Sequence, residues 1–132
     1  MGQQQLLLII LGVIIVGIAI AVGLSLFSAQ SIQANKDAMI NDINNLAAHA
    51  YQYRIRPSSM GGGGNSYSGY KIPSKMASNE NATYTLGNTP SSATDPVVFI
   101  ATSVQNSSNT VTVTIGTDGR PSGTWTYSGD FL

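Results

Sequence analysis

Few residues in this 132-residue chain have side chains that could do chemistry, and those few are widely spaced. There is one histidine, His49, and there is no cysteine, so thiol chemistry, disulfides and zinc–thiolate sites are excluded. Asp95, Asp118 and Asp130 lack the spacing of an EF-hand calcium loop. Gly61–Gly64 lacks the Gly-Lys-Ser/Thr ending of a phosphate-binding loop and is interpreted as slack. We therefore predict a protein that is not an enzyme and that has no cofactor and no bound metal.

The charge balance excludes a further class. Six basic and six acidic residues give a net charge of zero, and charged residues make up 9% of the chain against about 25% in an average protein. Binding to a phosphate backbone needs a basic surface, so no nucleic-acid partner is predicted.

Two triplets match the acceptor pattern for N-glycosylation. They are Asn81-Ala82-Thr83 and Asn106-Ser107-Ser108, which makes Asn81 and Asn106 candidate modification sites. Such triplets also arise by chance in polar sequence, so an unmodified hydroxyl-rich surface is the alternative.

The element that dominates the sequence is the apolar segment Leu6–Phe27, which contains no charge and no proline. As a helix, its 22 residues would be about 33 Å long, which is close to the hydrocarbon thickness of a bilayer. Neither flank carries a nearby cation, and the first one in the chain is Lys36. Because cations beside a membrane segment orient a new single-pass protein, we expect that a short basic leader preceded Met1 and was removed.

The helical period continues beyond the apolar segment until Pro57 ends it. One helix is therefore predicted from about residue 2 to about residue 55. Its second half is amphipathic. The apolar stripe recurs at spacings of three, four and seven, and includes Ile32, Met39, Ile40, Ile43, Leu46, Ala47, Ala50 and Tyr51.

A small antiparallel sheet of about four strands is predicted near the C-terminus. The candidate strands are residues 82–87, 97–104, 110–116 and 123–128, joined by short turns such as Asp118-Gly119. A sheet with one apolar face needs a cover, and the stripe is the candidate. The predicted packing residues are Ile32, Met39, Ile40, Ile43, Leu46 and Tyr51 on the helix, and Val111, Val113, Ile115 and Trp125 on the sheet.

The predicted fold is thus α+β, with a long N-terminal helix whose amphipathic half packs on the sheet and whose apolar half protrudes. Four segments follow from it: 1–27, the apolar half; 28–56, the amphipathic half; 57–80, a Gly/Ser-rich connecting loop; and 81–132, the β region. Exposing the apolar half to water would cost tens of kcal/mol, at about 1.5–3 kcal/mol per large side chain. It must lie in lipid or against copies of itself.

In this architecture the chain resembles the type IV pilin family, most strongly over residues 1–55. The resemblance implies a mature subunit that a prepilin peptidase has cut, with methylation at Met1. It implies residence in the inner membrane, followed by assembly by the pilus machinery into an extracellular homo-oligomeric helical filament with a core of packed helices.

Two residues depart from the family pattern. Pilins usually have glutamate at the fifth position, where this chain has Gln5, which accepts a hydrogen bond but carries no charge. Many bacterial members have proline near position 22, where this chain has Val22, so we expect a more continuous helix with any loosening near its glycines.

Small residues four apart let apolar helices approach closely, and Gly17, Ala21 and Ser25 have this spacing. The predicted assembly residues are Met1, Gln3, Gln4, Gln5, Leu6, Gly12, Gly17, Ala21, Ser25 and Phe27. Adhesion, motility, DNA uptake and secretion all use such filaments. The alternatives are a pseudopilin of a secretion system, a monomeric membrane-anchored binding module, and an archaeal filament subunit.

Overall fold

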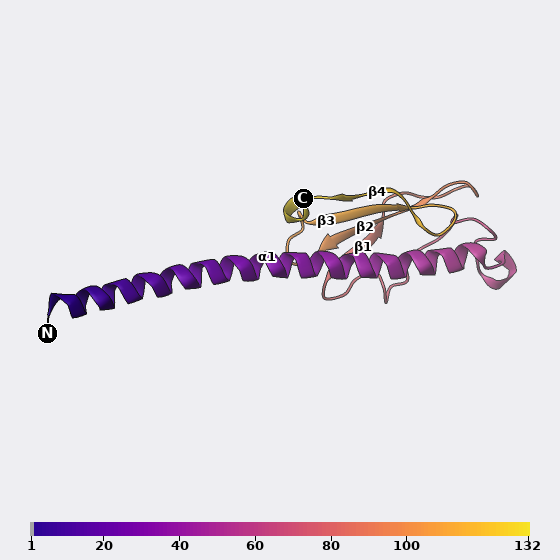
Figure 1. The fold of residues 1–132 in the computed structure, drawn as a ribbon. Coiled ribbons are helices and arrows are strands. Elements are labelled where there is room, and N and C mark those ends of the chain that lie inside the picture. Colours follow the sequence, from indigo (N-terminus) through magenta and orange to yellow (C-terminus); the bar gives the residue numbers. More distant parts are fainter. Residues whose placement is uncertain (1) are drawn as a thin grey trace. The chain divides into compact units, whose positions relative to one another are not determined.

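One long helix and a four-stranded sheet make up the computed structural model, which describes residues 2–132 (Figure 1). The fold is α+β, as predicted. Two compact units divide the chain, one ending at Ala34 and the other running from Asn35 to Leu132. We call the second unit the head.

Helix α1 runs from Gln3 to Ile55 without interruption, which confirms the predicted single helix. It continues through Gly12, Gly17 and Gly23, so the glycines do not break it. The segment contains no proline, so no backbone donor is removed from the helix near these glycines.

The loop after α1 caps the end of the helix. The backbone N–H groups of Gly63, Gly64 and Asn65 donate to the carbonyl oxygens of Tyr53, Arg56 and Arg54, at 2.8, 3.0 and 2.6 Å. These carbonyls are among those that a helix end leaves without partners.

The interpretation of Gly61–Gly64 as slack was therefore wrong. A Cβ atom on Gly62 would lie 2.3 Å from the Arg56 carbonyl oxygen, and one on Gly63 would lie 1.8 Å from that of Ser66. Glycine is needed here because the chain folds back directly onto the end of the helix.

The sheet is an antiparallel meander in the order β1-β2-β3-β4, as the short turns predicted. Its strands are β1 (Ala82–Leu86), β2 (Val97–Ser103), β3 (Thr110–Ile115) and β4 (Pro121–Tyr127). β4 starts two residues before the predicted strand, and its pairing with β3 shifts between Thr112 and Thr114.

The core of the head lies between α1 and one face of the sheet. On the helix, Met39, Ile43, Leu46, Ala47 and Ala50 are buried. On the sheet, alternate residues are buried, namely Ala82, Tyr84, Val97, Phe99, Ala101, Val111, Val113 and Ile115. Buried residues alternate along the strands and recur every three or four residues along α1. These are the two spacings of apolar residues seen in the sequence.

Three predicted packing residues lie at the edge of this core and are only half-buried. They are Ile40, Tyr51 and Trp125. Tyr51 lies against the β3–β4 turn, where a Cβ on Gly119 would come within 2.6 Å of its ring. Trp125 is on β4, whose other residues are mostly exposed because it is the last strand of the sheet. Ile32 belongs to the first unit, and its packing on the sheet stays a prediction.

Candidate functional site: an apolar helical surface

The candidate site is the surface of the first unit, where the large apolar side chains of Leu6–Phe27 are all exposed. The exposed fraction ranges from 52% at Ile14 to 75% at Phe27. The N-terminal part of α1 is apolar on every side, so no rotation of the helix hides these side chains from water. At about 1.5–3 kcal/mol per large side chain, burial of this surface is worth tens of kcal/mol.

The glycines on this surface leave open space. A Cβ atom on Gly12, Gly17 or Gly23 would meet nothing within 4 Å. Gly17, Ala21 and Ser25 lie one turn apart on the same side of an unbroken helix. The backbone is therefore accessible along this strip, which is the geometry that a second helix needs for close approach.

The start of α1 is polar but uncharged. Gln3, Gln4 and Gln5 are exposed, and the Gln5 N–H donates to the Gly2 carbonyl at 3.2 Å in the first turn. The side-chain amides of these residues can donate and accept hydrogen bonds. Met1, the predicted site of cleavage and methylation, lies outside the described residues.

By length and composition, α1 is a helix that could cross a membrane. Its most apolar 18-residue window has no side chain buried within the protein. A membrane-spanning or membrane-anchoring role therefore fits this segment.

His49 and Asp95, which have side chains that could do chemistry, make structural hydrogen bonds instead. His49 Nδ1 lies 3.1 Å from the Tyr70 hydroxyl. Asp95 accepts from the N–H groups of Ser91 and Ser92 at 2.9 and 3.0 Å, and these bonds hold the pKa of its carboxyl below the ordinary value. Over residues 2–132, no three His, Cys, Asp or Glu side chains are grouped to hold a metal ion.

Asp118 and Asp130 have local partners as well. Asp118 Oδ1 accepts from the Arg120 N–H at 3.0 Å, which is a plain turn as predicted. Asp130 lies beside Asn109, whose side-chain oxygen accepts the Asp130 N–H at 2.8 Å.

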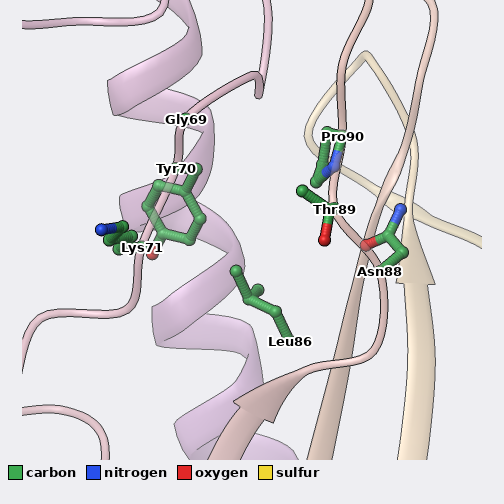
Figure 2. Close-up of a pocket in the computed structure, with 7 residues that line it drawn as sticks. All are labelled: Gly69, Tyr70, Lys71, Leu86, Asn88, Thr89 and Pro90. Carbon is green, nitrogen blue, oxygen red and sulfur yellow. The ribbon is translucent and has the colours of Figure 1, made fainter.

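A small cavity in the head lies between the connecting loop and the chain after β1. Figure 2 shows Tyr70 and Lys71 beside α1, with Asn88, Thr89 and Pro90 across from them. Its volume is about 290 Å³. Both polar atoms of the Asn88 side chain are bonded within the protein, to the Pro96 carbonyl and the Val98 N–H.

Two buried tyrosines lie outside the predicted set of helix–sheet packing residues. Tyr67 and Tyr70, in the connecting loop, are 0% and 4% exposed. The Tyr67 hydroxyl donates to the Gly116 carbonyl at 2.6 Å, and the Tyr70 ring meets Phe99 edge-on. Their spacing of three in a loop otherwise rich in glycine and serine is the signal that marks them.

The two candidate glycosylation sites differ in exposure. Asn106 is exposed in the turn between β2 and β3, whereas Asn81 is half-buried and precedes the buried Ala82.

No family model, curated protein or solved structure matches the chain.

Proposed function

We propose that this protein is the structural subunit of an extracellular filament similar to a type IV pilus. Copies pack through the apolar surface of α1, and the heads form the outside. Before assembly the subunit lies in the inner membrane, held by the same apolar segment. The leader peptidase and the assembly machinery are the partners that the resemblance implies.

The single observation that carries the proposal is the apolar segment Leu6–Phe27, whose large side chains are all exposed on a continuous helix. A lipid bilayer covers such a surface, and so does a bundle of identical helices. A filament subunit would use the two covers in succession. The apolar surface that lies in the bilayer before assembly is the surface that packs against other subunits in the filament.

Two further features support a structural role. The side chains of His49, Asp95 and Asp118 make hydrogen bonds within the head, and the chain carries no net charge. The small residues Gly17, Ala21 and Ser25 provide a strip for close contact between copies, with space for a neighbouring helix beside the Gly17 backbone.

Electron microscopy of material sheared from the cell surface tests the proposal. We expect long filaments that bind an antibody to the head and contain this chain as their main component. Sedimentation of the same material without detergent should carry the chain into the pellet. Recovery of the protein solely as single molecules in membranes would contradict the proposal and would indicate a membrane-anchored binding module.

A further inference from the structure

The head has two ends, set by the direction of its part of α1. From Asn35 to Ile55 the helix advances about 30 Å. We call the region around residues 35–37 the near end and the region around residues 54–56 the far end. Figure 1 shows the C-terminus beside the first turns of this part of the helix and the loop after Pro57 at the opposite end.

All three arginines of the chain lie at the far end. Arg56 is exposed after the last turn of α1. Arg54 is buried, donates to the Ala93 carbonyl at 3.1 Å and lies over the Tyr67 ring. Arg120 is exposed in the β3–β4 turn, whose Gly119 lies against Tyr51.

Two acids share the far end with these arginines. Asp95 lies in the loop that Arg54 holds, and Asp118 lies in the turn of Arg120. Both carboxylates accept backbone N–H groups of their own turns. Three arginines against two aspartates leave one net positive charge at this end.

The near end has the opposite sign. Asp37 lies one residue after Lys36 on α1, and Asp130 precedes Phe131, whose carbonyl accepts a hydrogen bond from Lys36 Nζ at 3.4 Å. Glu80 precedes Asn81, whose carbonyl accepts from Asn35 at 3.1 Å. Three acids against Lys36 leave two net negative charges at this end.

Each end also exposes large apolar side chains. Ile55 and Met60 are 56% and 70% exposed at the far end. Val104 and Leu132 are 55% and 94% exposed at the near end. The Val104 N–H bonds the same Asn81 carbonyl that Asn35 does, which fixes it at that end.

We propose that heads contact one another end to end, with the far end of one copy against the near end of the next. This inference rests on the proposed function and adds a second interface to it. Opposite charges and apolar groups on different surfaces of one molecule favour a head-to-tail contact, which propagates into a helical polymer and not a closed dimer. The polarity of the head therefore gives the filament its direction and spacing.

Charge reversal at the two ends tests this contact in the full-length chain. A far-end variant carries Arg56→Glu and Arg120→Glu, and a near-end variant carries Glu80→Lys and Asp130→Lys. The measurement is the concentration of protein left in the supernatant when detergent is removed at low salt and filaments are pelleted. We expect each variant to raise this concentration about tenfold, and the chain carrying all four changes to return near the wild-type value.

A control variant carries Lys71→Glu and Lys75→Glu, which together make the same charge change as the far-end variant at two exposed residues of the connecting loop. Lys71 follows Tyr70, whose hydroxyl lies beside His49, and Lys75 lines a hollow with Asp42 and Asn45, so both lie along the middle turns of the helix in the head. This control variant should assemble as the wild type does. Circular dichroism melting in detergent checks that each variant head is folded. The end-to-end contact would be overturned if the wild type formed filaments and both double variants assembled normally. It would also be overturned if the fourfold variant did not recover assembly. In either case the packing of copies through the apolar surface of α1 would be unaffected. Failure of the wild type to polymerise would instead overturn the proposed function.

Discussion

Three buried tyrosine hydroxyls make the head sensitive to alkaline pH. Burial raises the pKa of Tyr70 to about 12, from an ordinary value of 10.0. Burial also raises the pKa of Tyr67 and of Tyr84, and at Tyr84 the hydrogen bond to Asp42 adds to the effect. In each case the fold favours the neutral phenol.

We predict that the free energy of unfolding of the head is constant from pH 8 to 9.5 and falls above pH 10. A raised pKa means that the unfolded chain loses its proton first, so the stabilisation is complete below pH 10 and is lost as the pH approaches 12. Between the ordinary pKa and the raised pKa, each of these tyrosines adds a slope of up to about 1.4 kcal/mol per pH unit. Denaturant unfolding of the detergent-solubilised chain measures it. Tyr70→Phe should remove the contribution of one tyrosine to this slope. An unchanged slope in the variant would contradict a role for Tyr70 in the pH dependence.

Gly63 is a second residue with a testable role. A methyl group there would collide with the Ser66 carbonyl and approach the Tyr53 ring. We predict that Gly63→Ala lowers the free energy of unfolding of the head by about 1–3 kcal/mol, because the cap of α1 must move. Gly17→Ala is the matched control, since its Cβ meets open space, and it should leave the melting temperature of the head unchanged.

Exposure separates the two glycosylation triplets. We predict that incubation of the folded protein with an oligosaccharyltransferase and a lipid-linked sugar modifies Asn106 and leaves Asn81 unmodified. Asn106 is exposed in a turn, whereas Asn81 leads directly into β1. Mass spectrometry of the intact wild type and of the Asn106→Gln variant after incubation measures whether a sugar has been added. Addition to the Asn106→Gln variant would show that exposure does not decide the site.

At the scale of elements, the strip of small residues on α1 is the clearest target. We predict that Gly17→Leu leaves membrane insertion and the head intact and weakens or blocks filament formation. Leucine at this position fits within the subunit, because nothing lies within 4 Å of the added Cβ, so the clash arises between copies. Gly23→Leu is the control, because it also adds a side chain in open space. Gly23 is six residues after Gly17 and therefore lies on a different side of the helix.

Membrane fractionation and electron microscopy of both variants measure the effect. Filaments should persist in Gly23→Leu and be lost or shortened in Gly17→Leu. Normal filaments from Gly17→Leu would show that this strip is not a contact, and equal loss in both variants would indicate a packing surface without a preferred side.

Much of the element structure could be predicted from sequence because its periods are clear. The apolar run, the stripe that includes Met39 and Ile43, and the alternation of Val111, Val113 and Ile115 each identify one element and the face that it buries. The turn residues between strands then make the meander the simplest connection.

The parts that were missed depend on tertiary contacts that leave weak local patterns. Arg54 is buried, although arginine is normally exposed, because the Ala93 carbonyl and the Tyr67 ring receive its guanidinium. Asn35 is buried because it bonds Asn81 and Ser103, neither of which is near it in sequence. For the candidate site, composition predicts the apolar surface, but it does not predict which side of the helix meets a neighbour.

At the scale of the whole molecule, charge and apolar surface are separated along the chain. No acidic or basic side chain occurs between residues 2 and 35, and all twelve lie in the head. We therefore expect two kinds of contact between copies, one insensitive to salt and one sensitive to it.

We predict that filaments persist at 1 M NaCl and between pH 4 and 9, and dissolve in detergent. Apolar packing carries no titratable group, and detergent supplies an alternative cover for the same side chains. High salt should soften the filaments by screening the end-to-end contacts of the heads, which persistence length in electron micrographs measures. Dissolution by salt alone would show that charge, and not apolar burial, holds the filament together.

The meander of β1 to β4 has a consequence for how the head forms. Each strand pairs with the strand that comes next along the chain, across a connection of five to ten residues. Such a sheet has low contact order, which goes with rapid folding. The strands can pair in order as the chain is synthesised, before the last residues have emerged. A newly made molecule would thus spend little time with its strand edges open to neighbouring chains.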